Sequence, residues 1–158
     1  MSQLAPEVKY AQLIDGDCEL VDGWIEDAVD FLEKSPEYAA AAGRLRERFP
    51  DASVYNYLCD VEWNTPIGDA DACGGIAMMR IEAFQSVDGF IPELIAGEEP
   101  ELCVRLRKNG WGIRRLDAEM ALHDVAMSRF SQWWKRARRA GHAYAQGADL
   151  HGAPPERM

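Results

Sequence analysis

The hydrophobic positions of the first third of the chain follow two different periods, which predict a strand and then a helix. Residues 8–14 form an apolar run that ends abruptly at the polar turn 15–17, as a buried strand does. Apolar residues then recur at helical spacing through residues 24–34. Asp22 is the predicted N-cap of this helix, and Ser35-Pro36 is predicted to end it.

The middle of the chain is less regular. Residues 38–43 predict a second strand although most of them are alanine, and residues 53–63 favour either a short helix or an irregular segment. Residues 64–75 are rich in Gly, Pro, Asp and Asn, which is typical of a loop. Residues 76–80 predict a strand, and residues 81–90 predict a short helix that Gly89 closes.

The C-terminal part predicts two helices separated by short strands. The first helix covers residues 99–109, the two strands are edge strands at 112–117 and 119–124, and the last helix covers 128–146. Alternating strands and helices predict an α/β fold with a mixed sheet flanked by helices. One domain is expected over residues 1–147, followed by a flexible tail at 148–158.

The overall composition is that of a globular protein. The 158 residues suffice for one core, and no apolar run approaches the roughly 20 residues that span a bilayer. The first ten residues lack the apolar centre of a signal peptide, so a cytoplasmic location is expected. The four cysteines show no CxxC spacing and are expected to be free thiols.

The charge is distributed unevenly along a chain whose net charge is −10. Residues 60–101 contain ten acids and one base, whereas residues 105–139 contain ten Lys or Arg and three acids. The acidic segment suits a cation or a hydroxyl-rich substrate, and the basic one suits phosphates, anionic lipid or an acidic partner. The alternative is that the two segments neutralise each other within one fold.

Asp15-Gly16-Asp17 is the first candidate site. Two carboxylates at a strand end can share a divalent cation, and oxygen ligands suit Mg²⁺ or Mn²⁺. Such a cation would stabilise a diphosphate leaving group. The alternative is an ordinary turn, in which this tripeptide is common.

Glu98 and Glu99 open the predicted helix after Gly97. Acids in a first turn are stabilised by the helix dipole, which is a purely structural explanation. In the functional interpretation, one of these carboxylates takes a proton from an acceptor hydroxyl.

Two further features can have a function only if the fold places them next to a ligand or to the other candidate residues. Gly74-Gly75 permits close approach of a ligand to the backbone, or simply a tight turn. His123 becomes a metal ligand if the fold brings it to Asp15 and Asp17.

The order of these motifs, from about Tyr10 to about Gly147, resembles glycosyltransferase family 2, whose members have the GT-A fold. The shared order is a strand ending in Asp-x-Asp, a Gly-Gly pair before a strand, and Gly-Glu-Glu opening a helix that continues as Leu-x-x-Arg-Leu, then a strand ending in His-Asp. The resemblance implies an inverting, metal-dependent transfer of sugar from a nucleotide-diphosphate sugar to an acceptor hydroxyl.

The resemblance also assigns roles to the candidate residues. It implies that Asp15 and Asp17 hold the metal and the nucleotide sugar, with His123 as a further ligand. It makes Glu99 the catalytic base, where the family usually has Asp, and Glu98 the adjacent candidate. It places Gly74 and Gly75 in the pocket for the acceptor and donor sugar.

One departure from the family concerns the start of the chain. GT-A enzymes usually place a nucleotide-binding βαβαβ unit before Asp-x-Asp, and here about 14 residues precede Asp15. The chain is therefore expected to be a truncated gene product, a fragment, or half of a split or oligomeric enzyme whose missing portion comes from a partner chain or a homo-oligomer. The alternative is a catalytically incomplete module that binds a partner.

The last predicted helix carries Trp133 and Trp134 beside four basic residues. This composition suits peripheral contact with the inner face of a membrane, or a protein partner, or ordinary core packing. No nucleic-acid partner is expected.

Overall fold

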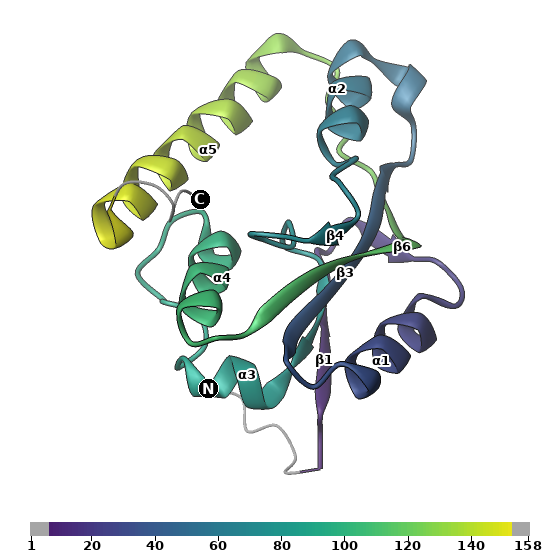
Figure 1. Ribbon diagram of the computed structural model, residues 1–158. Helices are drawn as coiled ribbons and strands as arrows, with labels where there is room; N and C mark the ends of the chain where they lie inside the picture. The colour runs from purple at the N-terminus through teal and green to yellow at the C-terminus, as the bar shows by residue number, and fades with distance from the viewer. Residues whose placement is uncertain (1–6, 153–158) are drawn as a thin grey trace.

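The structure, a computed structural model, describes residues 7–152 and is an α/β fold with one curled mixed sheet (Figure 1). Its strands are β1 (Tyr10–Leu13), β2 (Cys18–Leu20), β3 (Tyr38–Glu47), β4 (Gly68–Asp69), β5 (Ala77–Arg80) and β6 (Gly112–His123). Its helices are α1 (Trp24–Lys34), α2 (Val54–Glu62), α3 (Ile81–Ser86), α4 (Glu98–Lys108), α5 (Phe130–His151) and the short 3-10 helix η1 (Pro50–Ala52).

The sheet has the strand order β1-β5-β3-β6-β2, and β4 also pairs with β6. The β3–β6 pair is parallel, and all the other pairs are antiparallel. Among residues 7–152, β1 pairs with β5 alone, which leaves its other edge without a strand.

The prediction of two edge strands at 112–117 and 119–124 is wrong. The structure has one strand, β6, which lies inside the sheet with β3 on one side and with β4 and β2 on the other. The ladder between β3 and β6 shifts register near Ala42 and Arg44. These irregularities change the side-chain alternation, which is why the pattern looked like two short strands.

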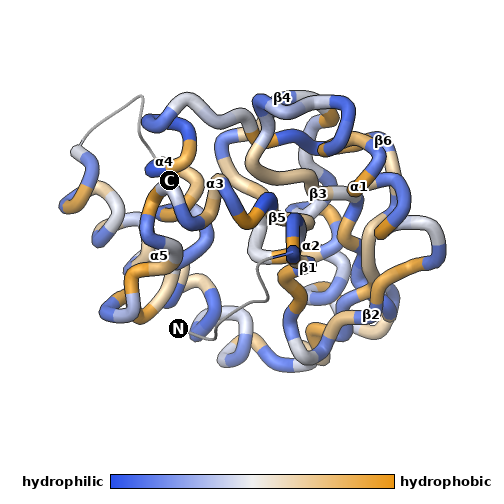
Figure 2. Tube along the Cα trace, turned by 90° about the horizontal axis from the view of Figure 1, so that it is seen from below, coloured by the Kyte–Doolittle hydropathy of each residue, from blue (hydrophilic) through white to orange (hydrophobic). Residues whose placement is uncertain are grey.

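Helix α1 covers one face of the sheet, and α3 and α4 cover the other (Figure 2). The α1 face buries Trp24, Ala28 and Leu32 against the sheet. The opposite face buries Leu102 and Leu106 of α4, together with apolar residues of β3, β5 and β6. The sheet therefore lies between two separate apolar clusters, one on each of its faces.

Gly43 of β3 is tightly packed against Trp24 of α1 and against β6. A Cβ added there would lie 2.6 Å from Cβ of Met120, 2.7 Å from the ring of Trp24 and 2.9 Å from the carbonyl oxygen of Ala118. Gly43→Ala is therefore expected to lower the free energy of unfolding by about 2 kcal/mol, because overpacking forces these groups apart. Urea denaturation measures this. Gly16→Ala is the control, since nothing lies within 4 Å of its added Cβ. If the two variants were equally stable, the close packing around Gly43 would be contradicted.

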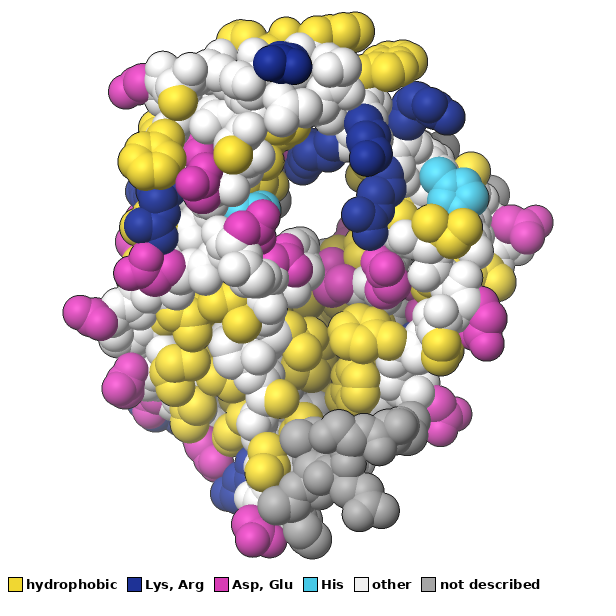
Figure 3. Space-filling model, turned by 180° about the vertical axis from the view of Figure 1, so that it is seen from behind, with side chains coloured by type: hydrophobic (Ala, Val, Ile, Leu, Met, Phe, Trp, Pro, Cys, Tyr) yellow, Lys and Arg dark blue, Asp and Glu magenta, His cyan; other side chains and the backbone are white. Residues whose placement is uncertain are grey.

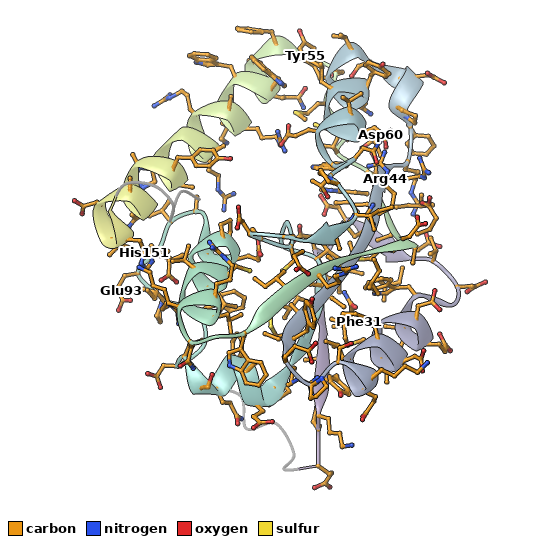
Figure 4. All side chains as sticks on the ribbon, viewed as in Figure 1. Phe31, Arg44, Tyr55, Asp60, Glu93 and His151 are labelled. Carbon is orange, nitrogen blue, oxygen red and sulfur yellow. The ribbon has the colours of Figure 1, made fainter. Side chains whose placement is uncertain are left out.

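Helix α2 is fastened to the end of β3 by polar contacts. The Nη2 of Arg44 donates to Oδ2 of Asp60 at 2.9 Å, and Figure 4 shows these two side chains facing each other. Asn56, which is buried, donates to the side chain of Glu47 and accepts from the backbone N–H of Met127. The inward side of α2 is thus held to the rest of the protein by hydrogen bonds, whereas most surface helices bury apolar residues on that side.

Three further boundaries differ from the predictions. The N-cap of α1 is Gly23 with a left-handed backbone, not Asp22. Strand β2 was not predicted because it has three residues only. Helix α5 extends to His151, beyond its predicted end at residue 146, because His151 contacts Glu101 of α4. Residues 153–158 of the predicted tail lie outside the described part of the chain.

Candidate metal and acceptor site

The antiparallel pairing of β1 and β5 brings two of the predicted motifs to one end of the sheet. Leu13 at the end of β1 pairs with Ala77 at the start of β5. The turn 15–17 follows the first strand directly, and Gly74-Gly75 shortly precedes the second. The carboxylate turn and the glycine pair are therefore neighbours although they are far apart in the sequence.

The structure brings Asp17 and His123 into direct contact. The Nε2 of His123 lies 3.2 Å from Oδ2 of Asp17, and the backbone N–H of Asp124 donates to the carbonyl of Asp17. The cause is the short β2–β6 ladder, in which Cys18 is opposite His123. The Asp17 side chain is 59% exposed, so this pair has access to solvent and to a ligand.

The surroundings of His123 fix its ring and leave one nitrogen unused. The ring stacks on Trp63 with centroids 4.8 Å apart and planes 9° apart. The Nδ1 atom is buried and has no hydrogen-bond partner among the described residues. A carboxylate oxygen beside an imidazole nitrogen fits a divalent ion such as Mn²⁺ that takes its remaining ligands from water or phosphate.

Cys18 and Asp15 lie close to this pair but differ from it chemically. Cys18 Sγ, Asp17 and His123 offer ligand atoms that all lie within 4.8 Å of one another. Burial, and then the charges of Asp17 and Asp15, raise the pKa of the Cys18 thiol to about 12. Cys18 is therefore a neutral thiol, which is a poor ligand for a hard cation. Asp15 is exposed and is not part of this cluster.

Glu99 belongs to a second cluster, at the start of α4. Its side chain is buried, and its Oε1 accepts hydrogen bonds from the backbone N–H of Cys73 and from the thiols of Cys73 and Cys103. Its Oε2 accepts one hydrogen bond, from the backbone N–H of Gly74 at 3.1 Å. Glu98 is more exposed. The longer side chain of Glu, where the resembled family usually has Asp, thus reaches the backbone of the glycine loop.

The backbone conformation at positions 74 and 75 requires glycine, and the space beside both residues is open. Gly74 and Gly75 have φ of 80° and 90°, a conformation that L side chains rarely adopt. No heavy atom lies within 4 Å of a Cβ added at either position. The loop therefore presents backbone to open space next to Glu99.

The molecule is hollowed between α5 and the sheet. Figure 3 shows an opening there with carboxylate side chains along one side and Lys and Arg side chains along another. Two cavities have other linings, and no predicted site residue lines either of them. One, of about 620 Å³, is lined by Arg44, Arg46 and Arg115 among others; the second, of about 450 Å³, is lined by Tyr38, Asp69 and Trp111 among others.

The sequence predicted Asp17, His123, Glu99 and the glycine pair, but it missed three of their neighbours. Trp63 stacks on His123, and the thiols of Cys73 and Cys103 both contact Glu99, with their sulfur atoms 3.7 Å apart. No spacing in the sequence pointed to Trp63 or Cys73, because their contacts join residues from different elements. Cys103 lies one helical turn after Glu99 in α4, and this i,i+4 spacing could have indicated the contact.

Comparison with known proteins gives matches to glycosyltransferases. A family model described as the N-terminal domain of galactosyltransferase matches residues 59–129, a segment that contains Trp63, Gly74, Glu99 and His123. No curated protein matches the chain. The resemblance to glycosyltransferase family 2 in particular stays a prediction.

A solved structure shares the fold. It is the mannosyltransferase PcManGT from Pyrobaculum calidifontis in complex with GDP-Man and Mn²⁺, with a TM-score of 0.64 and 16% sequence identity. The similarity covers 94% of this chain and 41% of that one, so the chain spans less than half of its structural relative. The chain therefore has the fold of part of a glycosyltransferase domain.

Proposed function

We propose that this chain forms the metal-binding and acceptor-side part of a glycosyltransferase. The observation that carries the proposal is the contact between Asp17 and His123, at the end of the sheet where β1 meets the glycine loop. An accessible carboxylate held against an imidazole has the ligand chemistry of a divalent-cation site. The likeness to a transferase bound to GDP-Man and Mn²⁺ supports the same function.

The donor is a nucleotide-diphosphate sugar. Asp17 and His123 hold Mg²⁺ or Mn²⁺, with Asp15 nearby on the same turn. When bound there, the cation supplies positive charge against the diphosphate leaving group. The Lys and Arg side chains that face the opening in Figure 3 add to this charge and favour a phosphate-rich ligand.

Glu99 accepts the proton of the acceptor hydroxyl, with Glu98 as the alternative base. The Oε2 of Glu99 is the suitable atom, because it accepts one hydrogen bond whereas Oε1 accepts three. The hydroxyl oxygen then bonds to the anomeric carbon while the bond from that carbon to the diphosphate breaks, so the anomeric configuration is inverted. Gly74 and Gly75 provide the open backbone surface on which the sugar or the acceptor lies.

A further segment or subunit pairs beside β1 and adds to the nucleotide-binding surface. Among residues 7–152 one edge of β1 has no paired strand, and this supports the proposal, since a further strand can pair there. A homo-oligomer would be the simplest source. The second candidate function is a binding module that keeps these contacts without turnover, and the unpaired edge of β1 favours it, because a partner strand can pair there.

A thermal-shift experiment separates the two functions. A ligand that binds only the folded state stabilises it by about 2.7 kcal/mol at 100 times its Kd. We expect Mn²⁺ together with GDP-mannose or a UDP-hexose to raise the melting temperature more than Mn²⁺ alone, and to give product with a suitable acceptor. If neither Mn²⁺ nor any metal–donor combination changes the melting temperature, the enzyme proposal is wrong.

A further inference from the structure

Helix α2 turns its apolar side to the solvent. Val54, Tyr57, Leu58 and Val61 follow one another at helical spacing and are 61%, 56%, 43% and 52% exposed. The inward side carries Asn56 and the small residue Cys59 instead. An amphipathic helix whose apolar stripe is uncovered has a surface that another apolar phase can bury.

The first turns of α5 extend this apolar stripe with aromatic side chains. Phe130 and Trp134 are 59% and 52% exposed, and their rings stack with centroids 6.1 Å apart. Figure 1 shows this end of α5 next to α2, and Figure 3 shows hydrophobic side chains gathered over the same end of the molecule.

Specific contacts hold α2 and α5 together as one surface. The Nη1 and Nη2 atoms of Arg136 donate to the two carboxylate oxygens of Glu62 at 2.9 and 2.8 Å. The hydroxyl of Ser53, the N-cap of α2, donates to the carbonyl of Met127 just before α5. The exposed apolar residues of α2 and of the first turns of α5 therefore form one feature, here named the α2/α5 surface.

The charge beside this surface is positive although the whole chain carries −10. Residues 125–148 contain no Asp or Glu, and Arg129, Lys135 and Arg138 of this segment are exposed. The two acids of α2 near the surface are already neutralised, since Asp60 pairs with Arg44 and Glu62 with Arg136. The apolar stripe is thus bordered by cations along α5, and Asp51, which is exposed just before α2, is an acid that remains beside it.

We propose that the α2/α5 surface binds the face of an anionic lipid bilayer. The apolar residues of α2 and the rings of Phe130 and Trp134 enter the headgroup region, and Lys135 and Arg138 contact lipid phosphates. Among residues 7–152 no helix is long and apolar enough to cross a membrane, so the contact is peripheral. The charge complementarity favours anionic lipid over a second copy of this acidic chain.

This contact also orients the candidate site. Trp63 directly follows α2 and stacks on His123, so the metal-site end of the sheet lies close to the bound bilayer. The lipid proposal itself does not depend on sugar transfer, and its test does not use enzyme activity.

Vesicle co-sedimentation tests the proposal. We expect the protein to sediment with vesicles of phosphatidylcholine and phosphatidylglycerol, but not with phosphatidylcholine alone, and to dissociate as salt is added. The double variant Lys135→Gln/Arg138→Gln is expected to bind about 30-fold more weakly, because each basic residue at an anionic surface contributes about fivefold in affinity. The variant Leu58→Gln/Val61→Thr is expected to bind more weakly without changing the net charge.

The control is Lys9→Gln/Lys34→Gln, which removes the same charge from two exposed positions, one just before β1 and one in α1. Circular dichroism and the melting temperature show that each variant is folded. Equal loss of binding in the control, or no binding of the unaltered protein to anionic vesicles, would overturn the proposal. Dimerisation without lipid that Leu58→Gln/Val61→Thr abolishes would show that a second copy covers the surface instead.

Discussion

Asp17→Asn is expected to lower the affinity for Mn²⁺ about 100-fold, and to lower sugar transfer by at least as much. Asp17 provides the one carboxylate in the cluster with His123, and Asn keeps its shape while removing the negative charge. A loss of about 2.7 kcal/mol in binding a divalent ion corresponds to this factor. Titration with Mn²⁺, followed by the electron paramagnetic resonance of the free ion, measures the affinity without a substrate.

Two further substitutions make this result specific. Asp27→Asn alters an exposed acid of α1 and is expected to leave Mn²⁺ binding unchanged. Asp15→Asn is expected to have a smaller effect than Asp17→Asn, because Asp15 lies outside the cluster. If Asp17→Asn binds Mn²⁺ as the unaltered protein does, the cation is not held here and the proposed chemistry loses its basis.

The elements with regular patterns were predictable from the sequence. Strand β1 and helices α1 and α4 lie within a residue or two of their predicted bounds, and both helices bury apolar residues at helical spacing. The prediction that the first strand is buried is wrong, because β1 lies at the edge of the sheet and all four of its residues are only partly buried. Strand β6 was not predictable as one strand. Asp117 and Glu119 interrupt its apolar pattern because they line a cavity rather than the core.

The site was predictable as a set of residues but not as a geometry. Asp17 meets His123 only because β2, a strand of three residues, pairs with the end of β6. Glu99 reaches Cys73 and Gly74 only because α4 packs beside the start of β5. Contacts between distant segments depend on tertiary packing, which single-chain periodicity does not encode.

The three acids of the first turn of α4 differ in burial and in role. The helix dipole explains why Glu98, Glu99 and Glu101 are tolerated there, but it does not explain their different burial. Glu101 is 0% exposed, whereas Glu98 is partly exposed. The sequence motif therefore combines two carboxylates for which we propose a catalytic role, Glu98 and Glu99, with Glu101, whose role is structural.

Glu101→Gln is expected to lower the free energy of unfolding by about 3 kcal/mol. Both carboxylate oxygens of Glu101 accept hydrogen bonds from Arg105, and Oε1 lies 3.0 Å from Nε2 of His151. Arg105 also donates to the carbonyls of Val87 and Gly89 after α3. Removing one partner of a buried pair leaves the other charge without compensation, which costs about 3–5 kcal/mol. Urea denaturation measures the loss.

Glu93→Gln is the matched control, because Glu93 is exposed and its substitution is expected to change stability by less than about 0.5 kcal/mol. Figure 4 places His151 at the end of α5 beside this part of the molecule. Since Glu101 fastens the last turn of α5 to α4, amide hydrogen exchange near His151 should also be faster in Glu101→Gln. Stability equal to that of Glu93→Gln, with unchanged exchange in α5, would show that the α4–α5 contact does not depend on this carboxylate.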